Sequence, residues 1–486
     1  MKALSLPVMV RVLLSWLGLG LVGLALAQAL GDQSHWFGYD FRVVEMPVLT
    51  FVTGAMVAGG VFCVAVLVVR RSLEAGVGGG PVLVLMLGFG LAFRLALLAS
   101  QPVLEDDYQR YLWDGAMTAH GFNPYAISPK YVRSVKAPRK VVALGERAGE
   151  VVPRINHPEL KTVYPPVAQF AFAIAHQIRP FSLGAWRALC FVGDLATLGL
   201  ILVLLREIGR PLLWSMLYWW NPIVIKELTN SVHMEAVLMP LVLLALWLAA
   251  RRRNLLACTI VGLAAGVKIW PALLLPLVAR RLAVEPARLA LGVGIFAALS
   301  ILWLVPVLLG GIDPTSGFVA YVSRWKTNSA LFPLLEGAAG ALRADLGWPW
   351  PEPAVIARLA IAGVVGAVAI GVALTVPRSS SDLLRRAALV VGALVLASPA
   401  QFPWYTIWII AFLPFFPPIT GFLVLTLTMP LYYSAFHFMA VDELATFTRH
   451  VVWWIWLPVW SLLLMQFALT GYRSLSTGRG SATVAS

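Results

Sequence analysis

Long apolar runs alternate with short polar connections along almost the whole chain. A bilayer core needs about 20 consecutive apolar residues per helix, and many of the runs reach or approach that length. We predict membrane-spanning helices at residues 8–30, 46–69, 81–100, 184–205, 211–228, 234–250, 255–278, 289–310, 354–376, 385–398, 404–417, 418–436 and 450–470. A further apolar stretch, 164–178, is a full span, a re-entrant segment or an interfacial helix. The pattern therefore predicts about 11 to 14 transmembrane helices.

Composition supports the same fold class. Hydrophobic residues make up 60% of the 486 residues and charged residues only 12%, which excludes a soluble globular protein. We predict an all-α polytopic membrane protein with a single domain over residues 1–471 and a disordered tail at 472–486. The first apolar run is too long for the core of a signal peptide and is interpreted as a retained span. Two hydrophilic segments, 101–163 and 311–353, form the largest predicted loops.

The net charge of +14 comes largely from short basic loops. Such loops mark the cytoplasmic side, and an anionic substrate could account for part of the remaining charge. Nucleic-acid binding is excluded because there is no soluble basic domain. The three cysteines lie within apolar runs without metal or disulfide spacing, so they are predicted to be small buried hydrophobic residues.

The basic loops also predict the orientation of the chain. The cytoplasmic candidates are Arg70–Arg71, Arg206 with Arg210, Arg251–Arg253, Arg280–Arg281 and Arg385–Arg386. With the N-terminus inside, three spans place 101–163 outside. Only one apolar run separates Arg251–Arg253 from Arg280–Arg281, so a simple count cannot put both inside. A helix broken at the two prolines of "KIWPALLLP" (268–276) would resolve this conflict.

The stretch "EDDYQRYLWDG" (105–115) places three consecutive acids at the end of an apolar run. Acids are costly at a membrane boundary, and their mutual repulsion and desolvation raise the pKa of at least one of them. A carboxylate with a raised pKa is a candidate general base. On a helix over 106–119, Asp106 would pair with Arg110, and Asp107, Tyr111 and Asp114 would share one stripe. The alternative is a solvated acidic helix start, since acids are favoured at helix N-termini.

Further polar residues interrupt apolar segments at "VYPPVAQ" (163–169), "NPIVIKELTNSVHMEA" (221–236), "GVKIWP" (266–271) and "SPAQFPWYTIW" (398–408). Ionisable residues within membrane segments indicate function. As alternatives, Lys268 could extend to the cytoplasmic interface, and His233 and Glu235 could form an ordinary hydrogen-bonded loop pair. His233, Glu235 and the aspartate pair could instead ligate a metal, although only one histidine is close in sequence.

The segment "DDYQRYLWDGAMTAHGFNPY" (106–125) resembles the signature of the GT-C superfamily of integral-membrane glycosyltransferases. It is most similar to bacterial polyprenol-phosphate-mannose-dependent mannosyltransferases. The later motifs "YPPVAQ", "NPIVIKE" with "HME", "GLAAGVKIWPALLLP" and "FPWYTIW" follow in the same order, so the resemblance covers residues 100 to about 415. The chain departs from the family pattern at Ala116, where an arginine is usual, and at Glu235, where an aspartate is usual.

The resemblance implies a multi-pass protein of the cell (inner or plasma) membrane with an extracytoplasmic active site. A sugar, by family mannose, would move from a polyprenyl phosphate to a hydroxyl of a glycan, glycolipid or protein, with inversion. No cofactor is required, although some relatives use a divalent metal. Asp106 or Asp107 would be the general base. The residues expected to bind donor phosphate or substrate are Arg110, Tyr111, Trp113, Asp114, Asn123, Tyr125, Tyr164, Lys226, His233, Glu235, Lys268, Arg324, Lys326, Trp404 and Tyr405.

Two other functions fit part of the pattern. A transporter or flippase of a lipid-linked or anionic substrate would also use broken helices and intramembrane charges. Transporters usually contain paired half-repeats, and the second half of the chain holds no convincing copy of 101–125. A lipid-linked polymer ligase or polymerase tends to centre on Arg/His loops rather than on an acidic pair.

Overall fold

The computed structural model describes residues 6–77, 79–347, 349, 351–417 and 420–480. Most of these residues are helical, and an isolated β-bridge joins Thr327 to Ala400. Within the described part, seven helices are long and apolar enough to cross a membrane, and four shorter apolar helices accompany them. The all-α polytopic membrane fold is therefore confirmed.

The main helices follow the predicted runs closely. They are α1 (Leu6–Gln33), α2 (Val48–Glu74), α3 (Pro81–Leu97), α7 (Leu183–Glu207), α10 (Glu235–Ala250), α11 (Asn254–Ala265), α13 (Pro286–Leu309), α16 (Pro353–Gly371), α17 (Ser380–Ala397), α19 (Thr420–Thr428) and α22 (Val452–Gly480). Many leucines, isoleucines and valines on α13 and α16 are exposed, as lipid-facing side chains are. Residues 348 and 350 of the predicted loop, 418 and 419 of a predicted span and 481–486 of the predicted tail lie outside the described residues. Helix α22 extends over 472–480, the first part of that tail.

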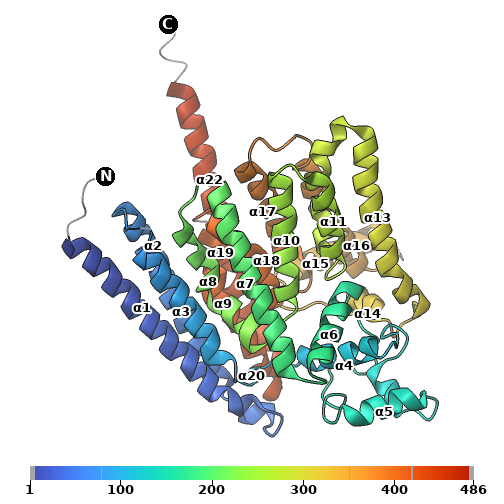
Figure 1. Ribbon diagram of the computed structural model, residues 1–486. Coiled ribbons are helices and arrows are strands. Elements are labelled where there is room, and N and C mark those ends of the chain that lie inside the picture. The colour runs from blue at the N-terminus through green and yellow to red at the C-terminus, as the bar shows by residue number, and fades with distance from the viewer. Residues whose placement is uncertain (1–5, 78, 348, 350, 418–419, 481–486) are drawn as a thin grey trace.

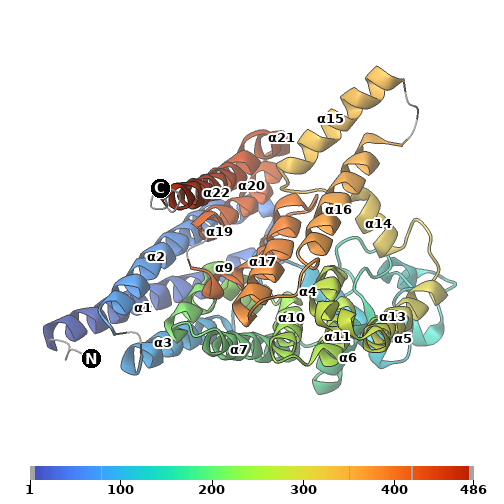
Figure 2. The same ribbon diagram turned by 90° about the horizontal axis from the view of Figure 1, so that it is seen from above.

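Figure 1 shows how the bundle is arranged, and Figure 2 gives a second view. Helices α1, α2 and α3 pack together along one edge, and α10 packs between α7 and α11. The N- and C-termini lie at one end of the bundle. The short helices α4 (Asp107–Ala119), α5 (Arg139–Arg147), α6 (Pro166–Ile178) and α14 (Gly317–Arg324) lie at the other end. The segment 101–163 thus forms a folded cap on the bundle.

Several predicted spans are broken rather than continuous. The predicted span 404–417 forms a 3-10 turn (Pro403–Thr406), α18 (Ile407–Ile410) and a second 3-10 turn (Leu413–Phe415), and 418–436 is divided by a 3-10 turn, Met429–Tyr433. Two further breaks, in 211–228 and 255–278, position charged residues. Residues 211–228 form α8 (Met216–Trp219), α9 (Pro222–Ile225) and a π-helical turn, Lys226–Asn230. After Ala265 the chain turns back through a 3-10 turn (Trp270–Leu274) and α12 (Leu275–Ala279).

The second break is a re-entrant hairpin. The Asn254 side chain donates to the carbonyl of Val278 at 2.5 Å, so the hairpin begins and ends at the same end of the bundle. Its tip lies at the capped end, where the Gly266 carbonyl accepts from the backbone N–H of Val167 at 2.8 Å. Arg251–Arg253 and Arg280–Arg281 therefore lie at one end, and the predicted break at "KIWPALLLP" is confirmed.

A buried ion pair joins three helices deep in the bundle. The Arg94 guanidinium of α3 donates to the Asp194 carboxylate of α7 at 2.5 Å, and Tyr218 of α8 donates to the same carboxylate at 2.7 Å. Arg94 also lies 3.4 Å from the ring centre of Trp219. Because each charge has partners, the pair can persist away from water, where an unpaired charge would be expensive.

Close packing of α4 on α6 positions the acidic motif. Gly115 faces α6, and a Cβ atom at this position would lie 2.4 Å from the Phe172 carbonyl oxygen. The helix ends at Ala119, and after the capping residue His120, Gly121 has φ +75°, a conformation that favours glycine. Gly115 therefore permits the close approach of α4 to α6, and Gly121 permits the turn that follows the helix.

Replacing Gly115 with alanine tests this packing. Because the added methyl group meets backbone rather than a flexible side chain, we expect Gly115→Ala to destabilise the fold by about 1–3 kcal/mol. Gly199→Ala on α7 is the matched control, since a Cβ atom at that position would meet nothing within 4 Å. Thermal unfolding in detergent should show a lower midpoint for Gly115→Ala alone, and equal midpoints for the two variants would contradict the packing argument.

Candidate active site

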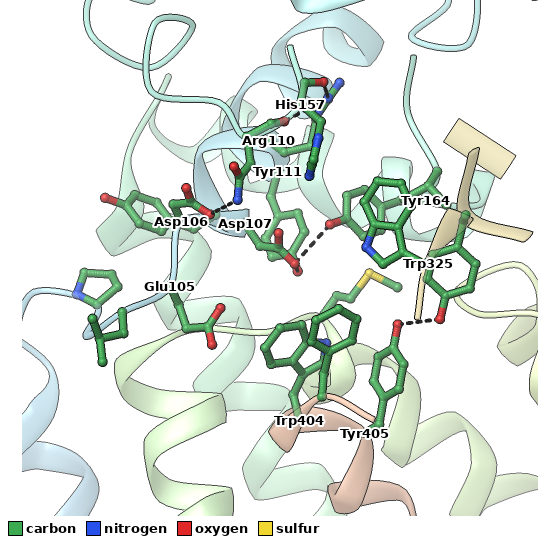
Figure 3. Close-up of a pocket in the computed structure, with 18 of the residues that line it drawn as sticks. Glu105, Asp106, Asp107, Arg110, Tyr111, His157, Tyr164, Trp325, Trp404 and Tyr405 are labelled. Atoms are coloured by element: carbon green, nitrogen blue, oxygen red, sulfur yellow. Dashed lines mark hydrogen bonds between the residues drawn. The ribbon is translucent and has the colours of Figure 1, made fainter. Parts of the chain in front are cut away.

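A cavity of about 840 Å³ opens where the cap meets the bundle. Its walls come from the segment before α4, from the loop after α5, from the hairpin tip, from α14 and from the region 394–408. Figure 3 shows the polar part of this cavity. Its charged and aromatic lining residues include Glu105, Asp106, Asp107, Arg110, Tyr111, Tyr164, Lys268, Tyr321, Trp325, Trp404 and Tyr405. A second lysine, Lys161, also lines the cavity and pairs with Asp313 at 2.6 Å. The cavity therefore combines acids, two lysines and many aromatic rings.

Arg187 of α7 holds the start of the segment that carries the acids. Its guanidinium donates to the carbonyls of Leu98 at 2.5 Å and Ser100 at 2.8 Å, just after α3 ends. It also donates to the Asn230 carbonyl at 3.2 Å, which joins this segment to the π-helical turn. Arg187 is buried, so these carbonyls provide the partners that its charge needs.

Asn230 holds the middle of the same segment. Its side-chain amide donates to the Gln101 carbonyl at 2.7 Å and accepts from the Val103 backbone N–H at 2.9 Å. Leu104 then has φ +56°, an unusual value for leucine. A backbone held in such a conformation needs support from its surroundings. The fixed segment presents Glu105, Asp106 and Asp107 to the cavity.

Asp106 precedes the first turn of α4 and points away from Arg110. Its Oδ1 accepts from the Asn156 side-chain amide at 2.8 Å. Burial, and then repulsion by Asp107, raises the pKa of Asp106 from its ordinary value of 3.8 to about 7. The predicted pair of Asp106 with Arg110 is wrong, because Asp106 lies outside the helix and Arg110 donates to carbonyls of residues 156–160 instead.

Asp107 is the first residue of α4, and its Oδ2 accepts from Tyr164 at 3.2 Å and from Tyr111 at 3.4 Å. In Figure 3 its carboxylate points into the space between Tyr164 and Trp404. The predicted stripe holds for Asp107 and Tyr111 only. Asp114 is buried outside the cavity lining, where burial raises its pKa, and Gln169 lies 3.4 Å from its carboxylate.

Lys268 contributes the positive charge of the hairpin tip. It bonds to the Glu235 carboxylate and lies 4.0 Å from the ring centre of Tyr405. Tyr405 shares a hydrogen bond of 2.9 Å with Tyr321 of α14. Because the tip is at the capped end, Lys268 lines the cavity and does not extend toward the end of the bundle that carries Arg251–Arg253.

His233 lies directly behind Trp404, and their rings stack with centroids 4.0 Å apart. The metal ligand set predicted from sequence is not assembled. Glu105 and Glu227, rather than Glu235 and the aspartate pair, lie beside His233 among the described acids. Lys226 lies next to Glu227, at 3.4 Å from its Oε1.

Several residues expected to bind substrate do not line the cavity. They are Trp113, Asp114, Asn123, Tyr125, Lys226, His233, Glu235, Arg324 and Lys326. Some of them support it: Tyr125 donates to the Tyr164 carbonyl at 2.7 Å, and Asn123 donates to the Pro306 carbonyl at 2.8 Å. Lys326 pairs with Glu336 at 3.0 Å.

Sequence reasoning missed other lining residues. Asn156, His157, Tyr321 and Trp325 come from the two hydrophilic loops, which carry no repeating pattern that would single them out. A weak signal existed for Trp325, because it lies in "SRWKTNSALF", an unusually polar stretch beside a long apolar helix. His157 has φ +50°, so the strained residues Leu104 and His157 both border the cavity.

An all-α polytopic membrane fold with an acidic cavity at one end is consistent with an integral-membrane glycosyltransferase of the GT-C superfamily. A family model described as alpha-(1->6)-mannopyranosyltransferase, N-terminal domain (MptA_B family), matches residues 12–284, more than half of the chain. The chain belongs to this mannosyltransferase family. No curated protein and no solved structure matches the chain. The matched range includes the three acids at 105–107 and Lys268 but ends before α13, so Trp404 and Tyr405 lie outside it.

The raised pKa of Asp106 predicts a pH-dependent stability. In the unfolded chain this group ionises near pH 4, whereas in the folded protein it keeps its proton up to about pH 7. The folded state therefore binds more protons in this window, and the free energy of unfolding falls as pH rises through it, by on the order of 4 kcal/mol at most. Asp106→Asn should remove this loss and be more stable than the parent at pH 8 but not at pH 4.

Thermal unfolding of both proteins between pH 4 and pH 8 checks the prediction. Asp345→Asn changes an exposed aspartate and serves as the control for loss of one charge. Parallel pH profiles for the parent and Asp106→Asn would show that Asp106 does not titrate in this window.

Proposed function

We propose that the protein transfers mannose from a polyprenyl-phosphate donor to a hydroxyl of an extracytoplasmic glycan or glycolipid, with inversion at the anomeric carbon. The observation that carries the proposal is the placement of an aspartate pair and a lysine in the walls of one cavity rich in aromatic rings. A donor with a lipid tail fits this site because the cavity lining also includes apolar side chains such as Ile269, Val322 and Leu394.

Asp107 is the proposed general base. Its Oδ2 is held by Tyr164 and Tyr111, which leaves Oδ1 for the acceptor hydroxyl. As the hydroxyl oxygen bonds to the anomeric carbon, its proton passes to Asp107, and the bond between that carbon and the phosphate oxygen breaks. Asp106 stands beside it in the cavity lining, and repulsion by Asp107 adds to the effect of burial in raising the pKa of Asp106.

The departing polyprenyl phosphate carries negative charge and needs a cation more than an acid. Lys268 is the proposed cation, because it lines the cavity. Its position is fixed by the Glu235 carboxylate and by the ring of Tyr405. Arg110 also lines the cavity, but the loop carbonyls use its donors. Beside Lys268, the apolar side chains Ile269, Val322 and Leu394 provide the path for the polyprenyl tail.

The stereochemistry of the family restricts the donor. A single displacement inverts the anomeric carbon, so an α-(1→6) product of the kind named for the family requires a β-linked mannosyl phosphate. The free 6-hydroxyl of a terminal mannose would be the acceptor. The rings of Trp404, Tyr405 and Trp325 offer flat apolar surfaces on which pyranose rings can pack.

The placement of the basic loops supports an extracytoplasmic active site. Arg251–Arg253 and Arg280–Arg281 lie at the end of the bundle opposite the cavity, as the hairpin between them requires. Short basic loops mark the cytoplasmic side, so the cavity opens on the other face.

Replacing the proposed base tests the mechanism. A positioned base contributes roughly 10²- to 10⁴-fold, so Asp107→Asn should lower kcat by at least 100-fold, and Asp106→Asn should lower it less. Release of polyprenyl phosphate from synthetic polyprenyl-phosphate-mannose with a mannoside acceptor measures turnover, with Asp345→Asn as control. Retained turnover in Asp106→Asn, Asp107→Asn and the double variant would remove the base assignment.

Replacing Lys268 tests the phosphate contact. Loss of a charge that stabilises the leaving group should lower kcat about 100-fold in Lys268→Met. The double variant Lys268→Met/Glu235→Gln removes the whole ion pair and avoids leaving a buried carboxylate without a partner. It should be equally slow, whereas Lys136→Met, in an exposed loop, should match the parent. Normal kcat in the folded double variant would rule out this role for Lys268.

A further inference from the structure

Beside the cavity wall that carries Glu105, Asp106 and Asp107, one histidine and two glutamates direct one ligand atom each toward a common point. His233 Nε2 lies 3.3 Å from Glu227 Oε2 and 3.8 Å from Glu105 Oε2. The three ligand atoms all lie within 4.8 Å of one another. The side chains of His233, Glu227 and Glu105 are 0%, 2% and 8% exposed, so the cluster is closed to bulk water.

The other two carboxylate oxygens already have partners. Tyr433 Oη lies 2.9 Å from Glu105 Oε1 and 2.7 Å from Glu227 Oε1. Lys226 bonds to the same tyrosine and lies 3.4 Å from Glu227 Oε1 and 3.5 Å from Glu227 Oε2. Tyr433 and Lys226 thereby orient both carboxylates so that each Oε2 faces the imidazole. Such outer partners commonly orient metal ligands.

His233 itself lacks a hydrogen-bond partner. It is fully buried, and neither Nδ1 nor Nε2 makes a hydrogen bond. A buried polar group without a hydrogen bond costs free energy, and a cation between Nε2 and the Glu227 carboxylate 3.3 Å away would offset that cost. With both carboxylates ionised and His233 neutral, the two glutamates and Lys226 carry a net charge of −1.

We propose that Glu105, Glu227 and His233 bind one divalent cation of the zinc type. Bonds of about 2.0–2.2 Å in tetrahedral geometry place ligand atoms about 3.4 Å apart, close to the two measured distances. One imidazole with two carboxylates suits zinc better than calcium or magnesium, which prefer oxygen ligands. The cation changes the net charge of the cluster from −1 to +1.

The proposed metal site borders the substrate cavity, because Glu105 forms part of the cavity wall. Trp404, which also lines the cavity, lies against His233 on the other side of its ring. Three protein ligands leave a fourth coordination position for water or an anion. Binding of the cation does not depend on the donor or on mannosyl transfer. It can therefore be tested without either.

The first experiment measures binding directly. The full-length protein in detergent is stripped with chelator, dialysed and titrated with ZnCl₂ by calorimetry, and bound zinc is counted by mass spectrometry. We expect one zinc per chain, and Glu227→Gln and His233→Ala should raise Kd at least tenfold. His176→Ala is the matched control, because His176 is another buried histidine with an Nδ1 that lacks a hydrogen-bond partner. It should bind zinc like the parent.

A second measurement on the parent protein protects the test against variants that fail to fold. X-ray absorption at the zinc edge should show nitrogen and oxygen ligands without sulfur, and zinc should raise the unfolding midpoint of the chelated parent. The proposal is overturned if the chelated parent binds no zinc at millimolar ZnCl₂, if sulfur ligands appear, or if folded His233→Ala binds zinc as tightly as the parent. Failure here would leave the transfer assay of the proposed function unaffected.

Discussion

The position of the acids depends on how the nine residues between α3 and α4 are held. This segment leaves a membrane helix without forming regular structure, so its carbonyls and amides need partners from elsewhere. Arg187 and Asn230 provide them from α7 and the π-helical turn, at distances of 2.5–2.9 Å. Because both partners are buried and held by several hydrogen bonds, the segment cannot relax into an ordinary loop. Three neighbouring carboxylates are held together at the cavity for this reason, despite their repulsion.

Irregular backbone supplies most of the other important side chains. Lys226 and His233 follow the break at Asn221 and Pro222, Lys268 lies at the hairpin tip, and Trp404 follows the prolines of 398–403. Non-helical backbone at membrane depth is tolerated where it is buried in protein or lines a cavity. Each break frees polar groups that neighbouring side chains then satisfy, as the Asn254 and Gly266 contacts of the hairpin show. The interruptions in the hydrophobic pattern are thus the parts of the chain that build the site.

The sequence predicts the helices and many pieces of the site, because apolar length, proline position and isolated charges are local properties. The hairpin at "KIWPALLLP" and the contact between Asp107 and Tyr111 both follow from such local rules. Contacts between distant segments are not predictable in this way. Glu105 lies beside Glu227 and Tyr433, which follow it in the sequence by 122 and 328 residues. Arg110 donates to loop carbonyls 46–50 residues away instead of pairing with Asp106, four residues before it. Asp114 has the right spacing for the stripe, but it lies farther along α4, where the packing of α6 covers it.

The re-entrant hairpin also determines how the two halves of the chain can share one cavity. Helix α11 runs toward the cap, the return segment 270–279 brings the chain back, and α13 runs toward the cap again, with Gly310 beside Tyr125. Without that return, α13 and every later helix would run in the opposite direction. Trp404 and Tyr405 would then emerge on the far face of the membrane, separated from Asp107 by the thickness of the bilayer. The ten residues of this return segment thus set the direction of the chain's C-terminal part.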